Sequence, residues 1–402
     1  NFFQRNNIKN YQVWDDKNLN LYQNKRPNNL EGALNKVDHI VLSPGISLNK
    51  SKNRKVLKKY KKKIITDLDI VFLTKNFSKS VVITGTNGKS TTCKILAHVL
   101  KKRYKVLLGG NIGIPILNLK IKKKNLLIIE ASSFQLAHSK FIQPDYALLL
   151  NITNDHLDWH GNLKNYIYSK FKIFENQKQN QYSLLNKKFK KLFKKKRLKS
   201  KLILPQLSKY LKLKHLVKNS YLKSDINNEN MSYVFTLSKL LKINEKTFFN
   251  SLISFKGLPH RYEIFLKKKN CIFVNDSKAT TFQASKFALE NSKNILWILG
   301  GQPKKNDKFF LKNLKNNIIK GYIIGKNVKF FKHQIKNGIS YSITKNLQQT
   351  IIQIMKDIKL LNKKRLTILL SPASASFDQY LNFEKRGEEF KRLIRYYAQR
   401  SI

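Results

Sequence analysis

The stretch from Val81 to Thr92 constrains the fold of this chain more than any other segment. Three apolar residues enter a turn that carries two glycines, and Lys-Ser-Thr follows the turn. Beyond it, apolar residues recur at helical spacing: Ile95, Leu96, Val99 and Leu100. The pattern predicts a buried strand, a loop of the size that holds a phosphate, and an amphipathic helix, which together are typical of an α/β domain.

The residues of this loop suit a nucleotide. Glycines at 85 and 88 allow the backbone to approach a polyphosphate, and the first amides of the helix point at the anion. Lys89 supplies a positive charge, and Ser90 offers a hydroxyl to Mg²⁺. The spacing is not the full Gly-x-x-x-x-Gly-Lys-Ser/Thr form, because Ile83 stands where the first glycine would fall. A plain strand-to-helix turn is therefore the alternative, but the strand before and the helix after favour nucleotide binding.

The basic charge of the chain is the main argument for a different function. Among its 402 residues are 80 Lys and Arg and 23 Asp and Glu, a net charge of +57 that suggests a nucleic-acid partner. The lysines are spread throughout, without an RNA- or DNA-binding motif or aromatic residues between the basic runs. We interpret the charge as a biased, solvated surface that attracts anionic nucleotides, and we expect no dedicated nucleic-acid partner.

Cysteine content and hydropathy exclude further classes. The two cysteines, Cys93 and Cys271, lack metal-type spacing, which argues against a disulfide framework or a zinc ribbon and suits a reducing cytoplasm. No apolar run approaches the roughly 20 residues of a membrane span. The sequence therefore predicts a cytoplasmic α/β protein of two or three domains.

Strand-like runs alternate with helical patterns along the chain and predict three α/β units, residues 1–66, 67–257 and 258–402. In the first unit, no Gly-x-Gly-x-x-Gly supports a dinucleotide site. The Lys-rich segment 187–201 is interpreted as a solvated helix face. The predicted strands outside the opening stretch are 11–16, 38–42, 64–65, 126–129, 147–150, 272–274, 295–299, 322–324 and 367–370.

Two strands of the central unit carry polar residues at their C-terminal ends. Glu130 follows the run 126–129, and Asp155 and His156 come after 147–150. Ligands collect at that edge of a parallel sheet, and a carboxylate with an imidazole is a reasonable Mg²⁺ shell beside a nucleotide. The alternative, that Asp155 and His156 cap the next helix, fits the sequence equally well.

Four segments together resemble the Mur ligases, the ATP-dependent amino-acid ligases of peptidoglycan precursor synthesis. They are Thr-Gly-Thr-Asn-Gly-Lys-Ser-Thr at 84–91, Gly-Gly-Asn-Ile-Gly at 109–113, Glu-Ala-Ser-Ser-Phe-Gln-Leu at 130–136 and Asn-Ile-Thr-Asn-Asp-His-Leu-Asp at 151–158. Three more, at 257–261, 275–280 and 370–379, make the chain most similar to the members that add D-glutamate. Ser-Lys-Ala-Thr at 277–280 is the most discriminating of them.

The resemblance implies three Rossmann-like α/β domains. The N-terminal domain, expected to be incomplete because the family's first strand, Gly-rich loop and helix are absent before Trp14, would hold UDP. The central P-loop ATPase domain, with a parallel sheet, would hold ATP, and the C-terminal domain the amino acid. The implied reaction transfers the γ-phosphoryl of ATP to the carboxylate of UDP-N-acetylmuramoyl-L-alanine, and the D-glutamate amine then displaces phosphate. A monomer that uses ATP and Mg²⁺ is expected.

The resemblance also implies roles for individual residues. Lys89, His156 and Lys170 would be catalytic, with Lys170 as a carbamate, although a surface lysine is the plain alternative in so basic a chain. The implied metal ligands are Ser90, Glu130, His156 and Lys170. The implied ATP contacts are Gly85, Thr86, Asn87, Gly88, Lys89, Ser90, Thr91, Asn227, Asn230 and Arg261. The implied UDP-sugar contacts are Ser43, Gly45, Asn111 and Ser132, and the D-glutamate contacts are Lys278, Thr280, Lys304, Ser376 and Phe383, which offer cations and hydroxyls to a dicarboxylate.

Two departures from the family pattern stand beside these matches. Ser224-Asp225-Ile226 replaces the usual Gly-x-His before the Asn pair, and Gln302-Pro303 precedes Lys304 where an acidic residue is frequent. Neither removes a phosphate- or metal-binding group. The alternatives are a sibling Mur or folylpolyglutamate-type ligase, against which 277–280 and 376–379 argue, a basic nucleic-acid-binding protein on the same scaffold, and a truncated, inactive chain.

Overall fold

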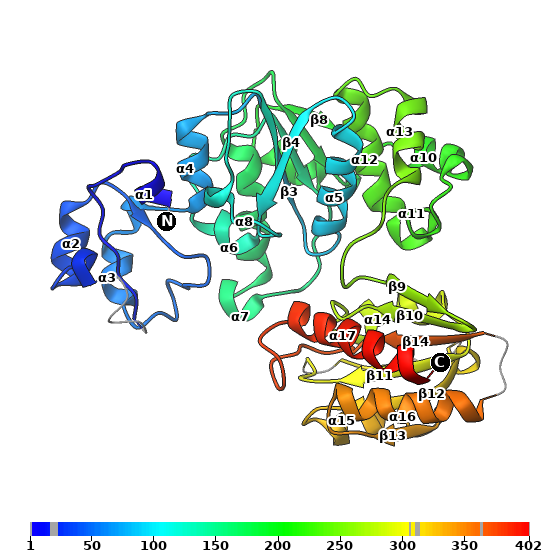
Figure 1. Ribbon diagram of the computed structural model, residues 1–402. Helices are drawn as coiled ribbons and strands as arrows, with labels where there is room; N and C mark the ends of the chain where they lie inside the picture. The colour runs from blue at the N-terminus through cyan, green and yellow to red at the C-terminus, as the bar shows by residue number, and fades with distance from the viewer. Residues whose placement is uncertain (1, 17–22, 305–306, 310–313, 362–364, 402) are drawn as a thin grey trace. The chain divides into compact units, whose positions relative to one another are not determined.

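The computed structural model describes residues 2–16, 23–304, 307–309, 314–361 and 365–401 (Figure 1). The chain divides into two compact units, residues 1–255 and 256–402. The first unit contains a two-stranded and a six-stranded sheet, and the second contains another six-stranded sheet. No helix in the described part of the chain is long and apolar enough to cross a membrane.

The helices and strands have the following bounds. In the first unit the helices are α1 (Phe2–Arg5), α2 (Leu30–Lys36), α3 (Arg54–Lys59), α4 (Asp67–Thr74), α5 (Lys89–Leu100), α6 (Ser133–His138), α7 (Leu157–His160), α8 (Leu163–Glu175), α9 (Lys190–Lys195), α10 (Leu207–Leu213), α11 (Ser220–Lys223), α12 (Asn228–Leu240) and α13 (Glu245–Ile253). Its strands are β1 (Ile40–Val41), β2 (Ile64–Ile65), β3 (Lys79–Thr84), β4 (Lys105–Gly110), β5 (Asn125–Glu130), β6 (Tyr146–Leu149), β7 (Tyr182–Leu185) and β8 (Lys201–Ile203). In the second unit the elements are β9 (Glu263–Lys268), β10 (Cys271–Asn275), α14 (Phe282–Glu290), β11 (Ile295–Gly300), β12 (Ile318–Ile324), α15 (Val328–Ile335), β13 (Tyr341–Ile343), α16 (Leu347–Leu360), β14 (Leu366–Leu370) and α17 (Phe383–Ser401).

The large sheet of the first unit is entirely parallel, with the strand order β4-β5-β3-β6-β7-β8. β3 is bonded on both edges, since Val82 pairs with Ile129 of β5 and with Ala147 of β6. Helices cover both faces of such a sheet, which is why its inner strands are continuous apolar runs rather than alternating ones. The predicted strands at 81–83, 126–129 and 147–150 are confirmed.

Two groups of helices enclose this sheet (Figure 1). On one face α4, α6 and α8 pack their apolar side chains against Val82, Leu127 and Leu149. α5 contacts β3, β4 and β5, and α12 and α13 pack against α5 on the opposite side. The predicted helix after the phosphate loop is confirmed as α5, and its buried face holds Ile95, Leu96, Val99 and Leu100.

The small sheet pairs β1 with β2 in parallel over a core that includes Leu34, Leu42 and Leu57. The predicted strand at 38–42 is thus confirmed in shortened form, and the one at 64–65 over its full length. The predicted strand at 11–16 is wrong, since these residues form no ladder. The segment is instead tied by local contacts: Trp14 Nε1 donates to Asp16 Oδ1 at 2.9 Å, and the Arg26 guanidinium covers the Trp14 ring.

The Lys-rich segment 187–201 is helical over only part of its length. A 3₁₀ turn at Lys187–Phe189 runs into α9, and Lys201 already belongs to β8. Phe193 of α9 is buried in the core, while Lys191 and Lys194 of the same helix are exposed. The predicted solvated helix face is confirmed for α9 and wrong for the remainder, which continues into an edge strand.

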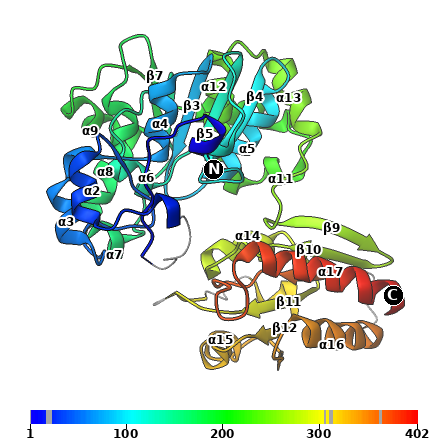
Figure 2. The same cartoon turned by 60° about the vertical axis from the view of Figure 1, so that its left-hand side comes forward.

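The sheet of the second unit has the order β13-β12-β11-β14-β10-β9, with only β9 antiparallel. α16 and α17 pack on one face, and α14 and α15 on the other (Figure 2). Trp297 of β11 is fully buried in this core, and its indole Nε1 donates to Ser371 O at 2.8 Å. The predicted strands at 272–274, 295–299, 322–324 and 367–370 are all confirmed, as is the α/β fold class.

Candidate functional site

The phosphate loop joins β3 to α5, and its shape depends on Gly88. Gly88 is the N-cap residue of α5 and has φ 81° and ψ −11°, a conformation that costs other residues free energy. A Cβ at this position would also overlap the Asn230 side chain of α12. Thr92 Oγ1 donates to Asn230 Oδ1 at 3.3 Å, so the structure places Asn230 directly against the loop, as its implied role requires.

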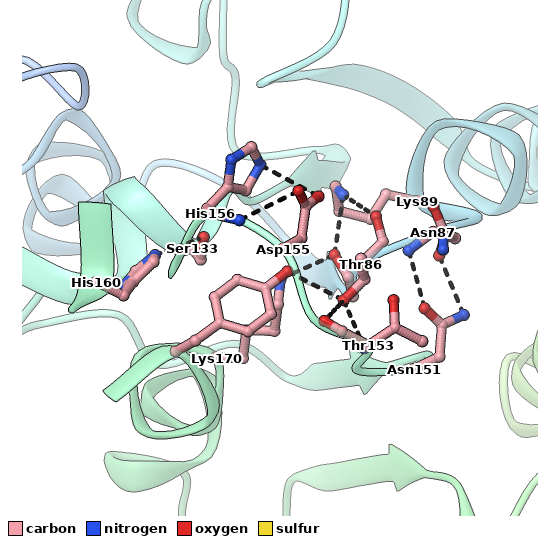
Figure 3. Close-up of polar contacts among 12 residues, drawn as sticks. Thr86, Asn87, Lys89, Ser133, Asn151, Thr153, Asp155, His156, His160 and Lys170 are labelled. Atoms are coloured by element: carbon pink, nitrogen blue, oxygen red, sulfur yellow. Dashed lines mark hydrogen bonds and ion pairs between the residues drawn. The ribbon is translucent and has the colours of Figure 1, made fainter. Parts of the chain in front are cut away.

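Asn151, which follows β6, holds the loop from the side (Figure 3). Its Oδ1 accepts from Asn87 N at 2.8 Å, and its Nδ2 donates to Asn87 O at 3.2 Å. Thr86 N donates to Asn151 O at 2.8 Å, and the Thr86 hydroxyl lies 3.0 Å from Tyr166 Oη. Hydrogen bonds to both its backbone and its side chains therefore fix the loop before any ligand binds, which reduces the conformational entropy lost on binding.

Two lysines converge on one carbonyl of this loop. Lys89 Nζ donates to Gly85 O and to Thr86 O at 2.9 Å each, and Lys170 Nζ of α8 donates to Gly85 O at 2.8 Å. Lys170 is 1% exposed, so it is not a surface lysine. Burial, and next the charge of Lys89, lower the pKa of Lys170 well below its ordinary value. The neutral amine, the form that reacts with electrophiles, is therefore easier to form here than in an ordinary lysine.

The Glu130 carboxylate at the end of β5 is buried and only partly satisfied. Its Oε1 accepts from Asn111 Nδ2 at 3.0 Å. Its Oε2 is buried and has no hydrogen-bond partner among the residues that the structure describes. Leaving a buried carboxylate oxygen unpaired is costly, and a bound cation would satisfy it. The donor set fits Mg²⁺, which is usually bound by one or two carboxylates together with phosphate and water oxygens.

Asp155 and His156 lie between β6 and α7 and contact each other (Figure 3). His156 is the N-cap residue of α7 with φ 52°, but its side chain makes no capping hydrogen bond. Asp155 Oδ1 accepts from His156 N at 3.1 Å, and Asp155 Oδ2 lies 3.4 Å from His156 Nε2. The alternative that Asp155 and His156 cap the next helix is confirmed for the position of His156, which is the N-cap residue, but the His156 side chain makes no capping hydrogen bond. Within the described residues, no group of three or more His, Cys, Asp or Glu is arranged around a metal position.

His160 belongs to this region but was not identified from the sequence. Its Nε2 lies 3.0 Å from Ser133 Oγ, and its Nδ1 lies 3.3 Å from Ser169 Oγ. Burial, and next His156, lower the pKa of His160 to about 4. The imidazole thus joins the Glu130 loop to the helix turn that carries Lys170. A histidine four residues after His156, one helical turn away, was the signal available in the sequence.

The implied UDP-sugar contacts are distributed over two places. Asn111 and Ser132 lie near Glu130, where Ser132 caps α6 by accepting from Gln135 N at 3.2 Å. Ser43 and Gly45 lie in the turn after β1, where Ser43 O accepts from Ile46 N. Asn227 is joined to Asn230, whose Nδ2 donates to Asn227 Oδ1 at 3.4 Å. The first unit therefore gathers the residues of 85–92 with Asn230, Glu130 and Lys170, and no hydrogen bond among the described residues joins Ser43 or Gly45 to that group.

The implied D-glutamate contacts all lie in the second unit, beyond the C-terminal ends of β10, β11 and β14. Lys278 Nζ lies 5.0 Å from the centre of the Phe383 ring, and Ser277 Oγ donates to Phe383 O at 2.8 Å. Gln302 and Ala375 exchange two backbone hydrogen bonds, which joins the loop of Lys304 to that of Ser376. Thr280 follows Lys278 in the β10 loop, and Arg261, an implied ATP contact, is also in this unit.

Two residues of this region to which the sequence assigned no individual role are buried. Arg386, in the first turns of α17, is 1% exposed and donates to carbonyls and a hydroxyl of the neighbouring loops. Asp276, after β10, accepts from Ser371 Oγ at 2.7 Å and from Tyr262 N at 3.0 Å. Burial raises the pKa of Asp276 to about 7. No short motif marks Arg386, whose bond to Ser277 joins residues 109 positions apart. Asp276 lies within the segment 275–280, but the sequence does not show its bond to Ser371, 95 positions away.

Comparison with known proteins gives consistent matches. Residues 83–251 match the family model described as the Mur ligase middle domain. A Rickettsia felis protein named UDP-N-acetylmuramoylalanine--D-glutamate ligase is 34% identical over 95% of this chain and 91% of that protein. A Buchnera aphidicola protein of the same name is 33% identical over 98% of this chain and 94% of that protein. Among solved structures, the Thermotoga maritima MurF ligase in complex with ADP shares the fold at a TM-score of 0.57 and 18% identity, covering 87% of this chain and 94% of that one.

Proposed function

Because this chain belongs to the Mur ligase family, we propose that it joins D-glutamate to UDP-N-acetylmuramoyl-L-alanine with ATP, in the cytoplasmic synthesis of peptidoglycan precursors. The observation that carries the proposal is the convergence of Lys89 and Lys170 on the phosphate-loop carbonyl of Gly85. The choice of amino acid rests on the name of the relatives that align over more than nine-tenths of both chains.

The reaction forms one amide bond in two steps. A carboxylate oxygen of the L-alanyl group attacks the γ-phosphorus of ATP, giving an acyl phosphate and ADP. The amine of D-glutamate then attacks the acyl carbon. The bond between that carbon and the phosphate oxygen breaks, inorganic phosphate leaves with the oxygen and the electron pair, and the amine loses a proton. Lys89 and the amides of residues 85–91 neutralise charge on the transferred phosphoryl group. Asn227, Asn230 and Arg261 position the nucleotide.

Mg²⁺ would be held by Ser90, Glu130, His156 and Lys170. When bound, the ion supplies charge neutralisation and orientation of the phosphate oxygens. The unpartnered Oε2 of Glu130 is the feature that fits a cation. Lys170 would serve as a carbamate, formed when its neutral amine attacks carbon dioxide and releases one proton. The lowered pKa of Lys170 favours this step, because an ammonium ion has no lone pair for the attack.

Each remaining part of the substrates is assigned to one of the three predicted domains. Residues 1–66 would bind the UDP end through Ser43 and Gly45, and residues 67–257 would bind ATP and contribute Asn111 and Ser132 to the sugar. Residues 258–402 would bind D-glutamate through Lys278, Thr280, Lys304, Ser376 and Phe383. A dicarboxylate is recognised by cations and hydroxyls, which this set supplies. The protein is proposed to act as a monomer.

The proposal is tested by phosphate release from the purified protein with ATP, Mg²⁺ and UDP-N-acetylmuramoyl-L-alanine. D-glutamate should start release of phosphate, while L-glutamate, L-lysine and meso-diaminopimelate should leave it at the rate seen without amino acid. Reactions that lack the UDP substrate control for simple ATP hydrolysis. Release with L-lysine or meso-diaminopimelate but not with D-glutamate would make the chain a sibling ligase.

A further inference from the structure

The guanidinium of Arg386 donates hydrogen bonds to two loops of the second unit. Its Nε donates to Ser277 Oγ at 3.0 Å, and its Nη2 donates to Ser277 O and to Ser374 O at 2.9 Å each. A longer contact of 3.4 Å joins Nη1 to Ala375 O. The rigid fork of an arginine can hold several acceptors in one fixed geometry, which the single ammonium of a lysine cannot. One side chain thus connects α17, the β10 loop and the β14 loop.

The burial of Arg386 makes this arrangement unusual. The side chain is 1% exposed, and no carboxylate of the described residues lies within ion-pair distance of it. Burying a cation without a paired anion is costly, and the carbonyl and hydroxyl acceptors offset part of that cost, together with the charge of Asp378 beyond ion-pair distance. Burial accordingly lowers the pKa of Arg386 to about 10. Such a residue is hard to explain by stability alone, since an apolar side chain of similar size would fill the space at lower cost.

The acceptors of Arg386 are next to the implied amino-acid contacts. Ser277 precedes Lys278, and Ala375 precedes Ser376. Ser277 Oγ, which accepts from Arg386, also donates to Phe383 O at 2.8 Å. Lys278, Ser376 and Phe383 therefore come from three segments of chain, the β10 loop, the β14 loop and α17, which meet at the Arg386 guanidinium.

The first turns of α17 are brought close to these loops by Gly387. A Cβ at this position would overlap His260 Nδ1 and the Asn275 amide. Asn275 Nδ2 donates to Gly387 O at 3.3 Å and lies 2.9 Å from His260 Nδ1. The close approach of the helix is thus built into the residue that follows Arg386, which keeps the guanidinium within reach of both loops.

We propose that Arg386 is a positioning residue that fixes Lys278, Ser376 and Phe383 relative to one another, so that they can hold the two carboxylates of the incoming amino acid. This inference rests on the proposed function, because it takes these residues as amino-acid contacts. The fork geometry, rather than the positive charge, carries the effect. A misplacement of about 1 Å in a binding group can reduce catalytic efficiency by about a hundredfold.

The test compares KM values for different substrates in the full-length protein. Arg386→Lys keeps the charge and removes the fork, and it should raise the KM for D-glutamate at least about tenfold with the KM for ATP within about twofold of wild type. Arg386→Met should match it. Ser277→Ala, which removes one acceptor and the bond to Phe383, should raise the same KM by a smaller factor. Arg392→Lys is the matched control, because Arg392 lies on the same helix with its exposed side chain paired to Glu389.

Two results would overturn the proposal. One is a wild-type KM for D-glutamate in Arg386→Lys, which would show that charge suffices. The other is an equal rise of the KM values for ATP and D-glutamate, which would show a general loss of structure. If Arg386→Met does not fold, Arg386→Lys and Ser277→Ala still give the answer.

A readout that needs no turnover separates this inference from the proposed function. Amide hydrogen exchange should be faster in residues 275–280 and 371–380 of Arg386→Lys, and unchanged in residues 85–92. Unchanged exchange in all of these segments would contradict the positioning role. If the wild-type protein released no phosphate with D-glutamate, the proposed function would fail while this exchange measurement still tested the cross-link.

Discussion

The phosphate loop of the first unit and the loops around Lys278 and Ser376 of the second both follow the C-terminal ends of parallel strands, but they are held in different ways. The phosphate loop is continuous in sequence and is fixed by Asn151 and by the close packing of Asn230 on Gly88. The loops around Lys278 and Ser376 are far apart in sequence and meet at the single side chain of Arg386. The continuous loop is held by contacts distributed along one segment, whereas the assembled loops share one central side chain that a substitution can remove.

The largest effect is expected at the phosphate loop. Lys89→Ala removes the cation that lies in the loop, and kcat should fall by about a thousandfold or more, because positioned charge is the main source of phosphoryl-transfer catalysis. Steady-state phosphate release measures the effect. Lys102→Ala, at an exposed position just beyond α5, is the control that should retain activity. An active Lys89→Ala protein would show that the phosphate loop does not act through the charge of Lys89.

An intermediate effect should distinguish crowding from backbone strain within the first unit. Gly88→Ala introduces both a side chain at φ 81° and an overlap with Asn230, and should lower the free energy of unfolding by about 2–4 kcal/mol. Gly113 has φ 64° but open space around its Cβ position, so Gly113→Ala should cost only about 1–2 kcal/mol.

Urea denaturation of both variants, together with Asn230→Ala and the Gly88→Ala/Asn230→Ala double variant, measures the crowding term. The double variant should recover part of the loss, because the overlap is gone while the strain at φ 81° remains. Equal costs for Gly88→Ala and Gly113→Ala would mean that Asn230 does not constrain the loop.

The smallest effect is a difference in pH dependence between the two units. The pKa of His160 is about 4 in the folded first unit and about 6.5 when unfolded, so the unfolded state binds a proton first as the pH falls. The stability of the first unit should therefore decline between about pH 6.5 and about pH 4. The pKa of Asp276 in the folded second unit is about 7, against 3.8 unfolded, so there the stability should increase as the pH falls from about 7 towards 4.

Tryptophan fluorescence can report on the units separately. Trp14 and Trp159 are in the first unit and Trp297 is in the second, so Trp297→Phe and Trp14→Phe/Trp159→Phe proteins each report on one unit. Urea midpoints at about pH 7 and about pH 4.5 should move in opposite directions, by the equivalent of about 1–3 kcal/mol. His160→Gln should reduce the first response but not abolish it, because burial also lowers the pKa of His138 in the same unit to about 4. Asp276→Asn should reduce the second response. Midpoints that move together in both reporters would contradict the assignment of these pKa values.

The first unit could be predicted from the sequence to a large extent, because its signals are local. Each signal is carried by a few neighbouring residues: the apolar run before the phosphate loop, the amphipathic pattern of α5, and the apolar runs of β5 and β6. The predicted strand at 11–16 failed, because an apolar and aromatic composition says nothing of whether a partner strand is available, and Trp14 instead contacts Asp16 and Arg26.

The second unit shows where sequence reasoning stops. Its strands were predictable, and Ser-Lys-Ala-Thr marked the amino-acid loop, but the roles of Arg386 and Gly387 were not visible. An Arg-Gly pair inside a helix reads as a solvated position with poor helix propensity. Only the folded structure places the guanidinium on Ser277 and Ser374, and shows that a side chain at 387 would strike His260.

The most direct test of the account follows oxygen atoms through the reaction. UDP-N-acetylmuramoyl-L-alanine labelled with a heavy oxygen isotope in its L-alanyl carboxylate is incubated with ATP, Mg²⁺, D-glutamate and the purified protein. The acyl-phosphate route moves a carboxylate oxygen into the released phosphate, so mass spectrometry should find one label in each inorganic phosphate formed and ADP as the nucleotide product. Label in AMP, or unlabelled phosphate together with amide product, would contradict the proposed phosphoryl transfer at the loop of residues 85–92.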